Sequence, residues 1–332
     1  MKIQAYAAHA PKTPLQPFSY EAEDLGAFGA EVEISHCGVC HSDLHLADGD
    51  WGTQHFPMVP GHEIIGTVKR LGSAADATLL GQRVGIGWQR SSCLHCEWCM
   101  TGQENLCRES VDTCVGHYGG FAQQIITDSR FMHPIPEALS SENAAPLLCA
   151  GITVYSPLAR YADHTSRVGI IGIGGLGHLA LQFADKMGCE VTAFSSSESK
   201  QDEALELGAD HFVNGRDESA MKSARGSLDL LICTAPYNLD WAAYLRTLRP
   251  NATLCFVANS GEPISFNVGR IFSNQSVAGS SIGGRQMMRD MLDFAARQKI
   301  NTWTETLPMD SVNTAFERLR SNDVRYRFVL EA

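Results

Sequence analysis

The chain has 332 residues, of which 44% are hydrophobic, and its 26 basic and 37 acidic side chains leave a formal charge of −11. This length predicts two domains at about 100–200 residues each, and the apolar fraction excludes a chain that is disordered throughout. The acidic balance argues against nucleic acid as a partner, because binding a phosphate backbone needs clustered lysine and arginine.

Short strands are predicted in the N-terminal part of the chain, which is rich in Gly, Pro, His and Cys. Apolar residues alternate or run between turn signals over 31–36, 63–71 and 83–86. The N-terminus shows no apolar segment followed by a cleavage site, so no secretory signal is predicted and we expect a cytoplasmic protein. In that reducing compartment, clustered cysteines indicate metal ligands more often than disulfides.

From about residue 166 the pattern changes to strands that alternate with helices. Strands are predicted over 168–173, 190–194, 211–214, 229–234, 252–258 and 276–280. Helices are predicted over 176–187, 203–207 and 241–248. The alternation implies βαβ units and a parallel sheet, which we place in a domain over 151–284.

The remaining C-terminal segment is expected to return to the first domain. It contains an amphipathic helix pattern near 288–295 and a final strand over 326–330. No membrane partner is expected, because the longest apolar stretch, 168–184, is interrupted by glycines and contains His178 and Gln182.

A glycine-rich turn follows the strand predicted over 168–173. The sequence Gly172-Ile-Gly174-Gly175-Leu176-Gly177 matches G-x-G-x-x-G and opens a predicted helix. Gly172 allows a tight turn, Gly174 lets the backbone approach a pyrophosphate, and Gly177 lets the helix pack close to the sheet. Amides at the helix N-terminus then meet the phosphates, so this turn predicts a dinucleotide site.

The end of the next strand indicates which dinucleotide is bound. An NAD-binding fold usually carries Asp or Glu there, about 20 residues after the turn, to hold the ribose 2′-hydroxyl. This sequence has Ser195, Ser196, Ser197 and Lys200 instead, whose donors and positive charge suit a 2′-phosphate. Glu198 argues against a 2′-phosphate, unless its carboxylate caps the following helix. We predict NADP(H).

Four cysteines are grouped as Cys93-x2-Cys96-x2-Cys99-x7-Cys107. Two consecutive C-x2-C steps and one longer loop place four thiolates around one tetrahedral ion, which predicts a structural zinc. An iron–sulfur cluster is the rival, but no proline follows the fourth cysteine and no second cluster-like run is present. His95 lies inside the group, yet four cysteines already complete the coordination shell.

Further metal-binding residue types are spread along the chain. They lie in Cys37-Gly-Val-Cys40-His-Ser-Asp-Leu-His45, in Gly61-His62-Glu63 and in Leu147-Leu-Cys149. With the four-cysteine segment and the glycine turn in the same order, these motifs resemble the zinc-dependent medium-chain alcohol dehydrogenases. The segments 147–155 and 195–200 resemble the cinnamyl-alcohol-dehydrogenase branch. The segments 84–88, 169–178 and 192–196 are similar to bacterial NADPH-dependent aldehyde reductases of that branch. The resemblance covers essentially the whole chain.

The resemblance implies an α/β fold in two domains. One is a GroES-like, β-rich catalytic domain over 1–150 and 285–332, and the other is a Rossmann domain with a doubly wound parallel sheet over 151–284. It also implies a homodimer formed through the cofactor domains, with the region 271–283 as a candidate edge.

The same resemblance implies a catalytic zinc and its surroundings. Cys40, His62 and Cys149 would be the ligands and Glu63 a transient ligand, whereas Cys37 is expected to be a small buried residue. Two zinc ions per chain are therefore expected. Asp43 is a candidate partner that orients a ligand histidine.

The remaining candidate residues concern proton transfer, cofactor and substrate. Ser42 and His45 occupy the family's relay positions, with a surface histidine on a loop as the alternative for His45. Further residues match cofactor contacts in the family or end a predicted sheet strand: Thr153, Thr234, Ser280 and Ile282. Trp51 and Trp88 resemble pocket-wall positions, with ordinary core aromatics as the alternative.

The resemblance predicts interconversion of aldehydes and primary alcohols by hydride transfer with NADP(H). Two indoles at the pocket favour reduction of aromatic or medium-chain aldehydes. Two other classes compete: a zinc-free quinone or enoyl reductase, which would not need either cysteine set, and a non-catalytic zinc protein or redox sensor. The complete nucleotide turn argues against the latter.

Overall fold

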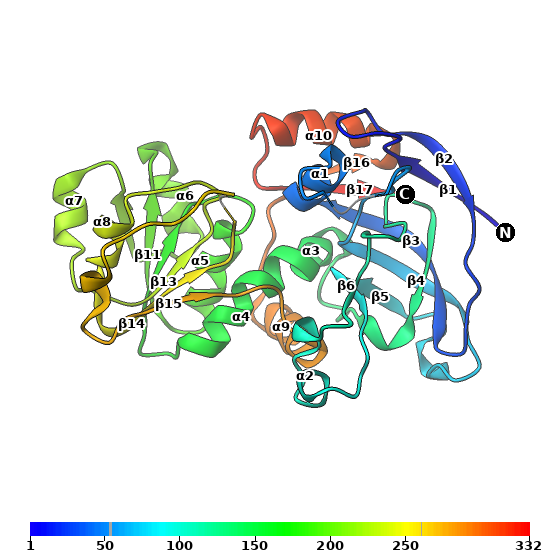
Figure 1. Cartoon of the computed structure of the whole chain (residues 1–332), viewed down its shortest axis with the longest axis horizontal. Coiled ribbons are helices and arrows are strands. Elements are labelled where there is room, and N and C mark those ends of the chain that lie inside the picture. The colour runs from blue at the N-terminus through cyan, green and yellow to red at the C-terminus, as the bar shows by residue number, and fades with distance from the viewer. Residues whose placement is uncertain (53–54, 260) are drawn as a thin grey trace. The chain divides into compact units, whose positions relative to one another are not determined.

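The computed structural model describes residues 1–52, 55–259 and 261–332. The chain divides into two compact units. The first consists of Met1–Cys149 and Gly283–Ala332, and the second of Ala150–Ile282. Figure 1 shows strands predominating in the first unit and alternating with helices in the second.

The first unit is built on a seven-stranded sheet with the order β16-β17-β3-β4-β5-β9, in which β8 also pairs with β3. Its strands are β3 (Gly29–Val39), β4 (Ile64–Leu71), β5 (Arg83–Ile86), β8 (Gln124–Asp128), β9 (Met132–Pro134), β16 (Thr304–Pro308) and β17 (Arg327–Glu331). Two-stranded sheets join β1 (Lys2–Ala7) to β2 (Gln16–Glu21) and β6 (Gln89–Ser91) to β7 (Val111–Asp112). The C-terminal strand β17 runs antiparallel to β3, which returns the chain to this unit.

The α-helices in the described part of the first unit are α1 (His41–Asp48), α2 (Glu97–Met100), α3 (Ser141–Pro146), α9 (Arg285–Gln298) and α10 (Val312–Arg320). In helix α9 the spacing of the apolar residues predicts which face of the helix is buried. Its apolar residues Met288, Met291, Leu292 and Ala295 are spaced at three and four residues and are all buried. Helix α1 begins directly after β3, with Cys40 as the residue before its first turn.

The second unit contains a six-stranded parallel sheet with the order β12-β11-β10-β13-β14-β15. Its strands are β10 (Arg167–Ile171), β11 (Glu190–Ser195), β12 (His211–Asn214), β13 (Leu228–Cys233), β14 (Leu248–Phe256) and β15 (Ser276–Gly279). Its helices are α4 (Ile152–Tyr161), α5 (Gly177–Lys186), α6 (Gln201–Glu206), α7 (Glu218–Ser223) and α8 (Trp241–Leu245). This is the strand order of the dinucleotide-binding fold, in which the chain reverses direction across the sheet between β10 and β13.

The predicted fold class is confirmed, but one predicted helix is wrong over its last residues. The helix expected over 241–248 ends at Leu245, and Leu248 already pairs with Leu228 as the first residue of β14. Pro250 lies two residues further on, and a proline disfavours helical backbone at the residue before it. Among the described residues, no helix is long and apolar enough to span a membrane.

Candidate metal centres and dinucleotide site

The four cysteines of the segment 93–107 come together. The sulfur atoms of Cys93, Cys96, Cys99 and Cys107 all lie within 4.8 Å of one another. The Cys93 sulfur is 3.9 Å from that of Cys99 and 3.5 Å from that of Cys107. Zinc–sulfur bonds of about 2.3 Å in a tetrahedron place the sulfurs about 3.8 Å apart, so this donor set fits a zinc ion.

Backbone amides favour the thiolate form of Cys93 in this cluster, whereas burial raises the pKa of Cys99 to about 11. Hydrogen bonds from the backbone of His95 and Cys96 lower the pKa of Cys93 to about 6. The amide of Glu109 donates to the Cys107 sulfur at 3.3 Å. The ring of His95 is turned to the carbonyl oxygen of Cys93, 2.7 Å away, and is exposed.

The segment that carries the four cysteines is tied to helix α9 through Glu104, which is 2% exposed. One Glu104 oxygen accepts from the Arg285 side chain at 2.8 Å, and the other accepts from the Arg285 amide at 3.0 Å. The Gln89 amide also donates to the Glu104 carbonyl at 2.7 Å. The segment therefore has a polar anchor within the first unit besides its thiols.

A second, more deeply buried cluster consists of Cys40, His62, Glu63 and Cys149, whose ligand atoms also lie within 4.8 Å of one another. Cys40 follows β3, and His62 and Glu63 precede β4. The antiparallel pairing of β3 with β4 therefore brings these distant segments together. His62 Nε2 lies 3.2 Å from the Cys149 sulfur.

Cys149 reaches the cluster from a π-helical turn, Leu147–Gly151, between α3 and α4. Such turns are rare and often mark functional sites, but no sequence pattern predicted this one. The hydrogen bond from Cys149 lowers the pKa of Cys40 well below its ordinary value. One thiolate is thus favoured before any cation neutralises the pair.

Asp43 connects two members of this second cluster. Its Oδ1 accepts from His62 Nδ1 at 2.8 Å and from the Gly61 amide at 2.8 Å, while Oδ2 accepts from the Cys40 amide at 2.9 Å. With the proton held on Nδ1, the lone pair of neutral His62 lies on Nε2, toward Cys149. Burial lowers the pKa of His62, but Asp43, Cys149 and Cys114 together outweigh it and raise that pKa above its usual range.

Glu63 has a partner that the sequence did not reveal. The buried guanidinium of Arg327, on β17, donates to Glu63 Oε1. Glu63 Oε2 is buried and has no hydrogen-bond partner within the part of the chain that the structure describes. Burial raises the pKa of Glu63 to about 7, although Arg327 opposes the shift. The signal for this pair was an arginine inside an apolar strand, since a buried charge needs a partner.

The predicted relay residues lie on α1, immediately after Cys40. Ser42 is half-buried beside Asp43. His45 Nδ1 donates to Asp50 Oδ2 at 2.9 Å, which gives this histidine a carboxylate partner that the sequence analysis missed.

The two predicted pocket tryptophans connect the relay histidine to the buried cluster. The His45 ring stacks on Trp51 with centroids 5.6 Å apart, and Trp51 meets the edge of Trp88 at 6.1 Å. Trp88 in turn contacts the His62 ring at 4.8 Å. Trp51 is 45% exposed, so it does not belong to the core.

Five cysteines remain outside the two clusters, and all are buried and unpaired: Cys37, Cys114, Cys189, Cys233 and Cys255. Cys37 is fully buried, as expected of a small core residue. Cys114 has closer neighbours than the sequence suggested, because its sulfur lies within 4.8 Å of ligand-type atoms of Asp43 and His62.

In the second unit, the glycine turn has the geometry that its motif requires. Gly172 adopts a φ of 89°, which favours glycine, and a side chain at Gly177 would clash with the Gly172 carbonyl oxygen. A side chain at Gly174 would meet nothing within 4 Å, so the backbone there is open to a ligand. The Thr234 hydroxyl donates to the carbonyls of Ile171 and Gly172, at 2.9 and 3.0 Å, and braces the turn.

The predicted 2′-phosphate segment begins at the last residue of β11, Ser195, and continues through Ser196 and Ser197. Lys200 reaches back to the glycine turn, where its ammonium donates to the Ile173 carbonyl. Glu198 accepts from the Asn214 amide at 3.0 Å, so its carboxylate has a local partner.

The other predicted cofactor residues lie on separate elements of this unit. Thr153 is 8% exposed on α4. Ser280 follows β15 and donates its amide to the Phe256 carbonyl at 3.0 Å, and Ile282 adopts a φ of 39°.

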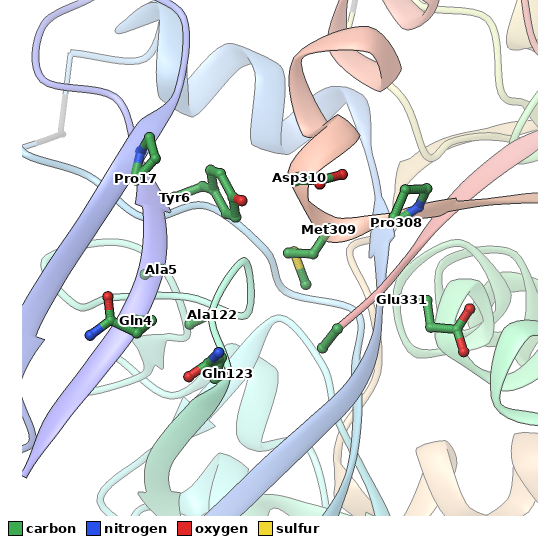
Figure 2. Close-up of a pocket in the computed structure, with 11 residues that line it drawn as sticks. Gln4, Ala5, Tyr6, Pro17, Ala122, Gln123, Pro308, Met309, Asp310 and Glu331 are labelled. Carbon is green, nitrogen blue, oxygen red and sulfur yellow. The ribbon is translucent and has the colours of Figure 1, made fainter.

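Three cavities differ in their relation to these residues. One of about 500 Å³ lies in the first unit, where Figure 2 shows Tyr6 on β1 and Met309 extending into the space between their segments. A second, of about 570 Å³, is lined by Arg130, Arg285 and Arg289 among others. A cavity of about 370 Å³ in the second unit includes a predicted site residue, Ser196.

Comparison with known proteins shows the family to which the chain belongs. Residues 26–137 match the alcohol dehydrogenase GroES-like domain, and residues 175–297 match the zinc-binding dehydrogenase family. The chain is 42% identical over 330 residues to an aldehyde reductase, AdhA, of a Synechocystis species, with 99% of this chain and 98% of that protein covered.

Solved structures are similar over the whole chain. A cinnamyl alcohol dehydrogenase from Sorghum bicolor matches with a TM-score of 0.95 and 38% identity, covering 100% of this chain and 98% of the other. CAD from Helicobacter pylori, complexed with NADP(H), matches with a TM-score of 0.91 and 31% identity over the same shares.

Proposed function

Because the chain belongs to the zinc-binding alcohol dehydrogenases, we propose that it interconverts aldehydes and primary alcohols by hydride transfer with NADP(H). The observation that carries this proposal is the buried cluster of Cys40, His62, Glu63 and Cys149. A dinucleotide turn with open backbone at Gly174 supports it in the second unit. We assign the catalytic role to the first unit and cofactor binding to the second.

Two zinc ions account for the two cysteine clusters. Cys40, His62 and Cys149 would hold the catalytic ion, since two cysteines and one histidine form the known ligand set of alcohol dehydrogenases and leave a fourth position open. Cys93, Cys96, Cys99 and Cys107 would close the structural site. Thiolate ligands need a reducing compartment, which supports a cytoplasmic location that cell fractionation can test.

When bound, the zinc polarises an aldehyde carbonyl and the reduced cofactor supplies the hydride. Asp43 holds the His62 ring so that Nε2 faces the metal position. Glu63 keeps one unpartnered carboxylate oxygen inside the cluster, which suits a transient ligand, while Arg327 holds the other oxygen and balances its charge.

A proton must reach the product oxygen in this buried place. Ser42 would donate it, and His45 would restore it from solvent, with Asp50 orienting the histidine.

Replacing His45 with alanine is expected to lower kcat about 10-fold while zinc content stays unchanged. Steady-state kinetics with NADPH measures this, and an unaltered kcat would assign His45 to the surface only.

The aromatic residues beside the cluster bear on the substrate. Trp88 contacts the ring of the ligand candidate His62, and Trp51 lies one ring further out, against Trp88. Such a wall favours flat or medium-chain apolar aldehydes over polar sugars.

The test of the whole proposal is a coenzyme and aldehyde comparison on the purified chain. We expect kcat/KM to be higher with NADPH than with NADH, and cinnamaldehyde, benzaldehyde and straight-chain aldehydes to be reduced. Metal analysis is expected to find two zinc ions per chain. A preference for NADH would refute the cofactor assignment, and one zinc without aldehyde-dependent NADPH oxidation would favour a non-catalytic zinc protein.

We also propose a homodimer formed along β15. This strand ends the six-stranded sheet, so one row of its backbone groups has no strand partner among the described residues. Apolar side chains nearby are exposed, with Phe272 at 78%, Val268 at 60% and Val277 at 40%.

Phe272→Arg is expected to shift the protein from dimer to monomer in sedimentation equilibrium. A wild-type chain that is already monomeric would contradict the proposal.

A further inference from the structure

The cavity of about 370 Å³ in the second unit lies where two parallel strands end. It is lined by Ser196, Gly215, Arg216, Glu218, Met221, Tyr237, Leu239, Asp240, Ala243 and Tyr244. Ser195 on β11 is paired with Asn214 on β12, and the Gly215 amide donates to the Ser195 carbonyl at 2.8 Å. The residues after both strands therefore lie side by side at the carboxyl edge of the sheet, where ligands of this fold bind.

Arg216 carries the unengaged charge of this cavity. Its side chain is exposed and makes no hydrogen bond or ion pair with the residues that the structure describes. Both acidic residues of the lining already have partners. Asp240 accepts from the Ala243 amide at 3.1 Å, and Glu218 pairs with Lys222 at 3.4 Å. The guanidinium is thus available to an anion, and its planar donors suit a phosphate.

Asn214 organises the surroundings of this arginine. Its side-chain oxygen accepts from the Arg216 amide at 3.0 Å, which fixes the backbone where the arginine begins. Its side-chain nitrogen donates to Glu198 at 3.0 Å and engages the one carboxylate of the serine segment. Asn214 therefore both positions the cation and partly offsets the acid that would repel an anion there.

Lys200 is the second cation near the serine segment, and it lies on the side of β10. Lys200 donates to the Ile173 carbonyl in the turn after β10, and β11 lies between β10 and β12 in the sheet. The serines at the end of β11 are therefore flanked by Lys200 toward β10 and by Arg216 toward β12. A doubly charged phosphate at the serines would have a cation on each side.

We propose that Arg216 binds the 2′-phosphate of NADP(H) and is a determinant of the preference for this coenzyme over NAD(H), an inference that rests on the proposed function. The sequence motif did not include this residue, because it lies just after β12, the strand that follows the serine segment. Arg216 adds a contact that NAD(H), with a 2′-hydroxyl, cannot use.

Calorimetric titration of the full chain with adenosine 2′,5′-bisphosphate and with 5′-AMP tests the proposal without turnover. We expect Arg216→Ala to weaken binding of the bisphosphate about 10-fold or more, since the substitution removes hydrogen bonds to a charged group. Binding of 5′-AMP should change less than about twofold, and Arg216→Lys should retain part of the preference. Arg225→Ala is the matched control, because Arg225 is exposed in the same unit and does not line the cavity.

The outcomes separate this inference from the proposed function. If the wild-type chain binds both ligands equally well, the NADP(H) assignment is wrong and the role of Arg216 falls with it. If the wild type prefers the bisphosphate and Arg216→Ala keeps that preference, only the inference about Arg216 is overturned. An equal loss for both ligands would also overturn it and would point to stacking of the guanidinium on adenine.

Discussion

Replacing Cys149 with serine is expected to lower kcat/KM for aldehyde reduction by about 10³-fold or more, since the Lewis-acid contribution of a bound metal is worth several kcal/mol. The Cys149 sulfur lies 3.2 Å from His62 Nε2 and is one of two thiols in the buried cluster. A serine hydroxyl in its place is a poor zinc ligand and leaves Cys40 and His62 alone. Zinc content should fall from two ions per chain to one.

A matched control is available in the same unit. Cys37 lies three residues before Cys40 and is fully buried, but it belongs to neither cluster. Cys37→Ala should keep both zinc ions and most of the activity, with a stability loss of about 1 kcal/mol. Full activity of Cys149→Ser together with two bound zinc ions would refute the assignment of the catalytic site.

The largest expected effect on stability comes from Cys96→Ser. Residues 93–107 contain only the four-residue helix α2 and a short 3₁₀ turn, so the thiols and the Glu104 anchor hold the segment in place. Closed four-cysteine zinc sites contribute folding free energy directly. Loss of several kcal/mol corresponds to a decrease in Tm of about 10 °C for a chain of this size.

Differential scanning calorimetry and metal analysis measure this second effect. Cys96→Ser should lose one zinc ion and unfold earlier, whereas Cys189→Ala should keep both ions. Cys189 is buried, donates to the Asp163 carbonyl at 3.3 Å and lies outside the clusters. A Cys96→Ser protein with two zinc ions and an unchanged Tm would contradict a structural zinc at this place.

The sequence predicted the features that depend on short spacing. The two C-x2-C steps and the glycine turn are local, so the backbone alone brings their atoms together. The alternation of strands and helices predicted the parallel sheet, and both the fold class and the family resemblance are confirmed. The helix expected over 241–248 was predicted too long, because Leu248 pairs with Leu228 in the sheet and Pro250 disfavours helical backbone before it.

Side-chain contacts that depend on how the chain folds back on itself were harder to predict. Asp50 was missed as the partner of His45, because an exposed acidic residue after a helix is common and carries no signal of its own. Arg216 was missed because its relation to the serines depends on the register of β11 against β12. Cys149 could be placed only through the family resemblance, since nothing in its own segment indicates the π-helical turn.

The eleven cysteines of the chain divide into four in the first cluster, two in the second and five buried elsewhere. The sequence by itself determined the four-thiol group, the dinucleotide turn and the two-domain α/β organisation, because each follows from spacing or periodicity. Only the tertiary structure decided that Arg327 neutralises Glu63, 264 residues away. A buried charge is tolerated only where another segment supplies its partner, and that pairing exists only after the sheet has formed.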